Sequence, residues 1–101
     1  MYTITKDRAN ELMLMHLTAR REQERIMLDR NVAYASERLE VLDRLIDVLM
    51  DEGIEAMRLE MDEQYLLLDK DGDSRRKISI KVTLRVLMSM SSDFISAIAL
   101  A

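Results

Sequence analysis

The chain of 101 residues contains no proline, and the first of its two glycines is Gly53. The long segment from Lys6 to Glu52 therefore lacks the residues that most often end helices, and leucine, methionine, alanine, glutamate and arginine dominate it. These residues have high helix propensity, which is informative over a window this long. We expect Thr5 or Thr3 to cap the start of the helical part, and Gly53 to end it because glycine adopts positive φ readily.

A single helix over this segment would be about 70 Å long, which is too long for one small domain. We therefore expect a hairpin of two helices, near residues 6–25 and 28–52, with a break or bend between Arg21 and Asn31. In the second helix, apolar residues recur at alternating spacings of four and three, the pattern of helices that pack on one another. This row consists of Leu28, Val32, Ala35, Leu39, Leu42, Ile46 and Leu49.

A second apolar row, formed by Val41, Leu45 and Val48, lies beside the first. Two adjacent rows make a face that is wider than one partner helix covers. We therefore predict that one row packs inside the protomer, and that the row from Leu28 to Leu49 mediates self-association as a homodimer or larger homo-oligomer. The alternative is that both rows belong to the internal core.

After the first glycine, the spacing of the apolar residues changes to two, which is typical of β-strands. A short alternation is followed by an apolar run over residues 65–68, and then by Asp71 and Gly72, a strong hairpin signal. The longest alternation is interrupted only by Leu87, and its members are Ile78, Ile80, Val82, Leu84, Val86, Met88 and Met90. Residues 54–90 are therefore predicted to form a three-stranded antiparallel sheet.

Two serines after this segment predict the capped start of a short C-terminal helix over residues 91–101. The expected fold is a single α+β domain over residues 1–101. In this fold the N-terminal helical hairpin (6–52) is followed by the three-stranded antiparallel sheet (54–90) and by the short helix. We expect the helices to cover one face of the sheet.

The residue types present exclude several kinds of site. Without cysteine there is no disulfide scaffold, thiol nucleophile or thiolate metal site. His16 is the only histidine, and the sequence supplies no companion signature for a catalytic role. Asp69, Asp71 and Asp73 carry oxygen ligands suited to Ca²⁺, but the spacing departs from the EF-hand pattern, so a turn is the simpler interpretation. We expect no enzyme activity, no catalytic residue, no metal and no cofactor.

The charge balance argues against nucleic acid as the main partner. Fifteen lysines and arginines against nineteen aspartates and glutamates leave a net charge of −4, whereas nucleic-acid-binding domains are usually basic. One basic stripe is nevertheless predicted around the start of the long strand, formed by Arg75, Arg76, Lys77, Lys81 and Arg85. Such a stripe contacts phosphates if it is open. Pairing of its cations with acidic residues of a neighbouring strand is the alternative.

No apolar run approaches the roughly 18 residues that a membrane span needs, and the first residues do not resemble a signal peptide. We therefore expect a small, acidic, cytoplasmic protein that does not bind membranes. The leading hypothesis is a non-enzymatic protein-interaction module, of the adaptor, inhibitor or chaperone type. It would act as a homo-oligomer and bind an unidentified protein partner. The alternative is a nucleic-acid-associated regulator that uses the basic stripe.

Overall fold

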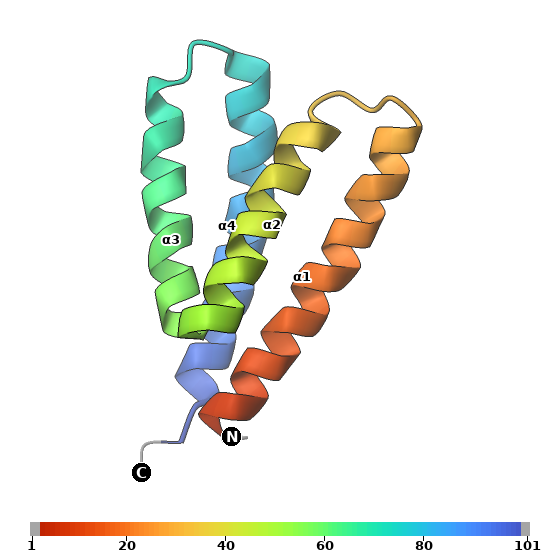
Figure 1. Ribbon diagram of the computed structural model, residues 1–101. Helices are drawn as coiled ribbons and strands as arrows, with labels where there is room; N and C mark the ends of the chain where they lie inside the picture. The colour runs from red at the N-terminus through yellow and green to blue at the C-terminus, as the bar shows by residue number, and fades with distance from the viewer. Residues whose placement is uncertain (1–2, 100–101) are drawn as a thin grey trace.

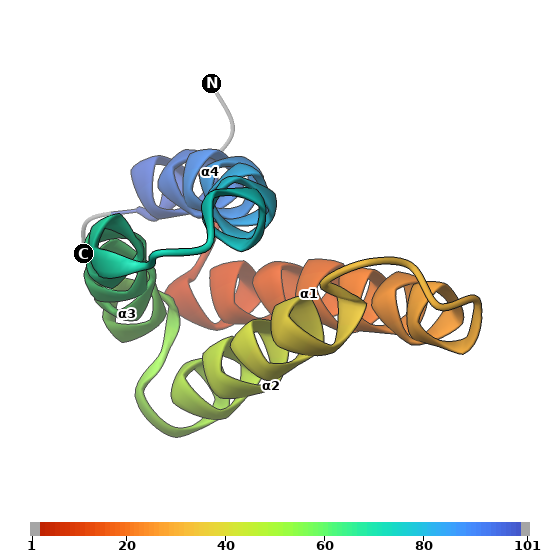
Figure 2. The same ribbon diagram turned by 90° about the horizontal axis from the view of Figure 1, so that it is seen from above.

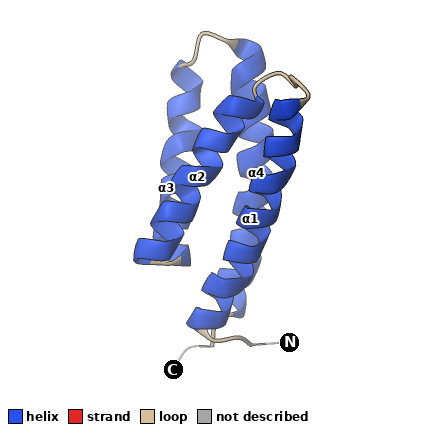
Figure 3. Ribbon diagram, turned by 45° about the vertical axis from the view of Figure 1, so that its right-hand side comes forward, coloured by secondary structure: helices blue, strands red, loops and turns tan. Residues whose placement is uncertain are grey.

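The computed structural model describes residues 3–99, and nearly all of them are helical (Figure 3). The α-helices are α1 (Lys6–Asp29), α2 (Ala35–Glu52), α3 (Ile54–Leu67) and α4 (Ser74–Ala97), with the 3₁₀ turn η1 (Leu68–Lys70) between the last two. Within the described residues there is no strand and no sheet. The predicted α+β fold is therefore wrong, and the segment expected to form a sheet is α3, η1 and most of α4.

The long alternation of residues 78–90 is compatible with a helix because only half of it faces the core. Ile80 and Leu84 are buried and Met88 and Met90 are partly buried, whereas Ile78, Val82 and Val86 are more than half exposed. Leu87, which interrupted the alternation, is only 3% exposed and continues the buried row one turn after Leu84. Spacings of four and three place these three residues on one side of a helix. The strand prediction failed because it treated the Leu87 position as an error in the pattern.

The predicted C-terminal helix over residues 91–101 is also wrong as a separate element. It is the last part of α4, which continues without a break to Ala97, and residues 100–101 lie outside the described part of the chain. Ser91 is fully buried inside α4, and its hydroxyl donates to the Met88 carbonyl at 2.9 Å. A serine that bonds the preceding turn is compatible with a helix interior, so it does not mark a helix start.

The break between the first two helices lies later than expected. α1 continues past residue 25 to Asp29, and α2 begins only at Ala35. The connecting loop turns through Asn31 and Tyr34, whose φ angles are +59° and +63°. Asparagine tolerates this left-handed conformation better than most residues, which explains the turn at Asn31 without glycine.

Two helix ends are positioned by side chains, and one of them connects distant parts of the chain. Thr5 caps α1, because its hydroxyl accepts a hydrogen bond from the Arg8 amide at 3.1 Å. Gly53 ends α2 with φ +95° and is also the residue that precedes α3. The Asn10 side chain of α1 accepts a hydrogen bond from the Ile54 amide at 2.9 Å, and this bond holds the start of α3 against α1.

The helices form two antiparallel pairs, α1 with α2 and α3 with α4 (Figure 1). The pairs approach each other where the chain ends meet, and α1 leans away from α4 towards the α1–α2 loop (Figures 1 and 2). At the closed end, the Ile4 amide donates to the Ala97 carbonyl at 2.8 Å, and the Ala99 amide to the Ile4 carbonyl at 2.9 Å. All four helices contribute to one core. None of the helices in residues 3–99 is long and apolar enough to cross a membrane.

A buried ion pair joins α1, α2 and α4 away from the closed end. Glu24 of α1 is fully buried, and its Oε2 accepts a hydrogen bond from Arg38 Nε of α2 at 2.7 Å. Arg38 Nη1 also donates to the Ala33 carbonyl at 3.0 Å and to the Ser79 hydroxyl of α4 at 2.7 Å. Arg20 Nη2 lies 3.1 Å from the second oxygen of Glu24. A carboxylate removed from water requires such partners.

Removing the arginine of this pair should destabilise the fold strongly. In Arg38→Met the Glu24 carboxylate stays buried without its main partner, and we expect a loss of about 3 kcal/mol in the free energy of unfolding. Urea unfolding followed by circular dichroism measures the change. Arg44→Met is the matched control, because the Arg44–Glu60 ion pair involves an arginine side chain that is 61% exposed. Its loss should be below about 1 kcal/mol.

Removing both charges should be tolerated better than removing one. The double variant Glu24→Leu with Arg38→Met leaves no charge of this pair in the interior, so it should recover most of the lost stability. Arg20 can then turn to water, because its side chain is already 37% exposed. If the double variant unfolds at lower urea than Arg38→Met alone, the buried pair is not the source of the effect.

Candidate protein-interaction surface

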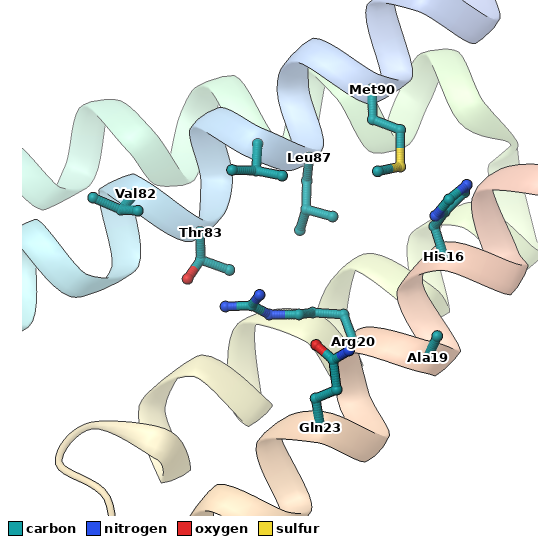
Figure 4. Close-up of a pocket in the computed structure, with 9 residues that line it drawn as sticks. His16, Ala19, Arg20, Gln23, Val82, Thr83, Leu87 and Met90 are labelled. Atoms are coloured by element: carbon teal, nitrogen blue, oxygen red, sulfur yellow. The ribbon is translucent and has the colours of Figure 1, made fainter.

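A groove opens between α1 and α4, and it contains a cavity of about 260 Å³. The α4 wall is largely apolar, and the α1 wall is mostly polar (Figure 4). The residues that line it are His16, Ala19, Arg20 and Gln23 on α1, and Val82, Thr83, Val86, Leu87 and Met90 on α4. The groove lies where α1 leans away from α4, so its width follows from the divergence of the two helix pairs.

The polar wall of the groove contains one incompletely paired cation. The Arg20 guanidinium points across the groove towards Thr83 (Figure 4). Arg20 Nε is buried and has no hydrogen-bond partner within residues 3–99, and the same holds for Glu24 Oε1. Arg20 Nη2 and Glu24 Oε1 are therefore close enough for an ion pair, but they do not form a hydrogen bond. His16, the candidate catalytic histidine set aside above, packs beside Phe94, with ring centroids 5.8 Å apart.

The solvent side of α4 carries an apolar row that the helical spacing brings together. We call it the outer face of α4, and it consists of Arg75, Ile78, Val82, Val86, Ser89 and Asp93. Its three apolar members are 61%, 53% and 56% exposed in chain order. Their spacings of four place them on successive turns of one helix side, roughly opposite the buried residues. Between Arg75 and Asp93 the residues of this face are uncharged, but exposed Arg85 borders it, and a shallow hollow lined by Arg85, Val86, Ser89, Met90 and Asp93 covers its C-terminal half.

The outer face was missed because its residues were read at a spacing of two. Read at helical spacing, the same sequence shows apolar residues at 78, 82 and 86 on one side and at 80, 84 and 87 on the other. A helix with apolar rows on two sides packs one row into the core of its own chain and leaves the second row exposed. This second row was the available signal for a docking surface.

The predicted self-association row is divided among different environments. Ala35, Leu42, Ile46 and Leu49 are buried in the core, and Leu39 is partly buried. Leu28 belongs to α1 and Val32 to the loop, where they are 42% and 43% exposed. The seven residues therefore do not form one continuous helix face. The parallel row of Val41, Leu45 and Val48 also packs into or against the core.

The predicted basic stripe lies on α4, and three of its five cations contact residues of α3, of η1 or of the loop that precedes α4. Arg76 donates two hydrogen bonds of 2.7 Å to Asp71, and Lys81 pairs with Asp69. Arg85 Nε donates to the Tyr65 hydroxyl at 2.8 Å. The two remaining members are Lys77, which is partly buried, and Arg75, which is exposed. Lys81 and Arg85 therefore lie along the contact of α4 with η1 and α3, whereas Arg75 lies on the outer face.

The acidic loop before α4 uses its carboxylates within the fold. Asp73 is the N-cap of α4 and accepts hydrogen bonds from the Arg75 and Arg76 amides, both at 3.1 Å. Asp71 accepts from the Asp73 amide at 2.9 Å in addition to Arg76. Gly72 lies in this helix-to-helix connection, not in the expected β-hairpin. In the part of the chain that the structure describes, no group of three or more acidic or histidine side chains could hold a metal ion.

The contact between Asp71 and Arg76 predicts a loss of stability in acid. Hydrogen bonds from Arg76 lower the pKa of the Asp71 carboxyl from its ordinary value of 3.8 to about 2. A lowered pKa in the folded state contributes stability above pH 3.8, and this contribution disappears as the pH falls towards 2. Asp71→Asn should therefore unfold more easily at neutral pH and lose less stability than the unmodified chain between these limits.

Urea unfolding at a series of pH values measures this difference. Asp69 and Glu60 also have lowered pKa values, caused first by hydrogen bonds from Lys81 and Arg44 respectively, so some acid dependence remains in the variant. Glu63→Gln is the matched control, because the exposed Glu63 makes no ion pair within residues 3–99. Parallel stability curves for Asp71→Asn and the unmodified chain would refute the assigned role.

Comparison with known proteins supplies no family to which this geometry can be assigned. No protein-family model matches the chain, and neither a curated protein nor a solved structure is detectably similar to it. A functional conclusion therefore rests on the fold and on the two adjoining features described above, the outer face of α4 and the groove between α1 and α4.

Proposed function

We propose that this chain is a non-enzymatic protein-interaction module that self-associates through the outer face of α4. The observation that carries the proposal is the exposure of Ile78, Val82 and Val86 along one side of a single helix. Single exposed apolar residues are common on protein surfaces and need no explanation. Three on successive turns of one helix side form the pattern that packing helices share.

The chemistry of these residues favours association. Each is β-branched, so its side chain is already restricted at χ1 and loses little freedom when a partner covers it. Burial of apolar surface contributes about 25 cal/mol for each Å² removed from water. The row is also supported from behind, because the opposite side of α4 is packed into the core. A rigid surface of this kind binds without first having to become ordered.

The proposal differs from the expectation from the sequence in the location of the interface. Four members of the row from Leu28 to Leu49 fill the core, and a second chain could reach them only if the helices separated. The outer face of α4 needs no such opening. The unidentified protein partner and the cytoplasmic location stay predictions.

Nucleic-acid binding receives less support from the same region. Arg76, Lys81 and Arg85 are held by Asp71, Asp69 and Tyr65, so a phosphate would have to replace these contacts. Affinity for nucleic acid arises mainly from cations that neutralise phosphates. The two remaining members, exposed Arg75 and partly buried Lys77, supply little of that affinity.

The solution mass tests self-association directly. Light scattering of the full chain from micromolar to high micromolar concentration should show a mass that rises from 11.8 kDa towards at least twice this value. The variant Val82→Glu with Val86→Glu should remain near 11.8 kDa, because it places charges in the contact. Both substituted positions are exposed, so the helical circular dichroism and the urea midpoint should change little.

The matched control is Leu59→Glu on α3, where the side chain is 65% exposed but lies outside the outer face. It should associate like the unmodified chain. A monomer at every concentration would overturn the proposal. An equal loss of association in Leu59→Glu would show that the contact is not on α4.

A further inference from the structure

We infer that the second copy lies antiparallel on the outer face of α4, with Arg75 of each chain paired to Asp93 of the partner subunit. This inference rests on the proposed function and specifies the geometry of the same surface. It would make Arg75 and Asp93 the residues that determine orientation, and Val82 and Val86 the centre of the contact.

The charge pattern of the outer face supports this orientation. The face begins with a cation at Arg75, continues through three apolar residues and a serine, and ends with an anion at Asp93. Both charged residues are exposed, and within residues 3–99 neither side chain forms an ion pair. The two charges are 18 residues apart, which corresponds to about 27 Å along the helix. They therefore mark opposite ends of the apolar row.

A second copy in the antiparallel orientation presents the same residues in reverse order, so that its charges are opposite to those it faces. An antiparallel copy centred at the level of Leu84 places Val82 opposite Val86 of the partner subunit, and Ile78 at the level of Ser89 and Met90 of the partner subunit. Arg75 then faces Asp93 of the partner subunit at both ends of the contact. A parallel copy would place arginine beside arginine and aspartate beside aspartate, and such like-charge contacts oppose association.

The area that a stable interface needs indicates where the second copy makes its remaining contacts. Stable interfaces bury about 1,200 Å² or more in total, which is more than a few apolar side chains provide. Val82 and Val86 belong both to the outer face and to the lining of the groove, whose other wall is α1, and Met90 lines both the groove and the hollow beside the outer face. The second copy should therefore also touch the polar rim of α1 at Ala19 and Gln23. We therefore expect a weak, concentration-dependent dimer.

Disulfide formation between single-cysteine variants tests the orientation. The chain contains no cysteine, so introduced thiols have no competitors. In a mixture of Arg75→Cys and Asp93→Cys under mild oxidation, antiparallel contact predicts disulfides between the two different variants. Disulfides between identical variants should be rare, because identical positions lie about 27 Å apart and a disulfide spans less than about 7 Å between Cα atoms. The mixed dimer also keeps one Arg75–Asp93 pair.

Each outcome of this experiment has a distinct meaning. Efficient disulfides within Arg75→Cys alone would overturn the antiparallel arrangement and indicate a parallel one. Equal yields in all combinations would mean that random collisions dominate, and would also overturn it. If light scattering shows a dimer but the mixed disulfide does not form, self-association stands and this geometry is wrong. If the unmodified chain is a monomer, the proposed function fails first.

Charge reversal provides a second test that uses no cysteine. Asp93→Arg should weaken the dimer about tenfold, because both ion pairs of the contact become repulsive. Adding Arg75→Asp to the same chain should restore the dissociation constant to within about threefold of the unmodified value, since the pairs are re-formed with exchanged signs. Glu63→Arg on α3 changes the net charge by the same amount and should leave the constant unchanged. Failure of the double variant to recover would contradict the pairing.

Discussion

The buried ion pair between Glu24 and Arg38 connects three of the four helices. A carboxylate that is fully removed from water is stable only when a cation and hydrogen bonds compensate for the lost hydration. The compensating guanidinium comes from α2 and also bonds Ser79 of α4. Towards the α1–α2 loop, therefore, α2 holds both α1 and α4, and α1 is connected to α4 only indirectly. At the other end, the backbone bonds between Ile4 and the end of α4 close the bundle.

This geometry explains why α4 has an accessible outer face and an adjoining groove. α2 and α3 cover its core side, and contacts from Lys81 and Arg85 to the Tyr65 ring hold its flank against α3. The outer face points away from the core, so the row centred on Val82 and Val86 is exposed. α1 leans away from α4 beside it (Figure 2). The groove, but not the exposure of the outer face, thus depends on where α1 lies. A change at Arg38 should therefore disturb the groove as well as the stability.

The second half of the chain shows why local patterns misled the prediction of the sheet. An alternation of apolar residues describes a strand, but it also occurs in a helix with apolar residues on two sides. Leu87 distinguished the two possibilities, because a strand leaves it on the polar face and a helix places it in the core. The pair Asp71 and Gly72 was equally ambiguous, since these residues suit a hairpin turn and a loop that caps a helix. Both patterns are present in the sequence, but they were assigned to strands and a hairpin turn when the structure has helices and a capping loop.

By itself, the sequence determined the helical character of the first half, the role of Gly53 as a junction, the cap at Thr5 and the lack of thiol chemistry. These properties depend on covalent chemistry and on the conformational preferences of residues that are close in sequence, so a local pattern is enough to predict them. Only the tertiary structure decided which apolar residues of α4 are buried and which cations are already paired. These outcomes depend on contacts between distant segments, such as Arg38 with Ser79 and Arg85 with Tyr65. The spacing of residues in the sequence does not encode such contacts. The contacts nevertheless decide whether an apolar residue is buried in the core or stays exposed.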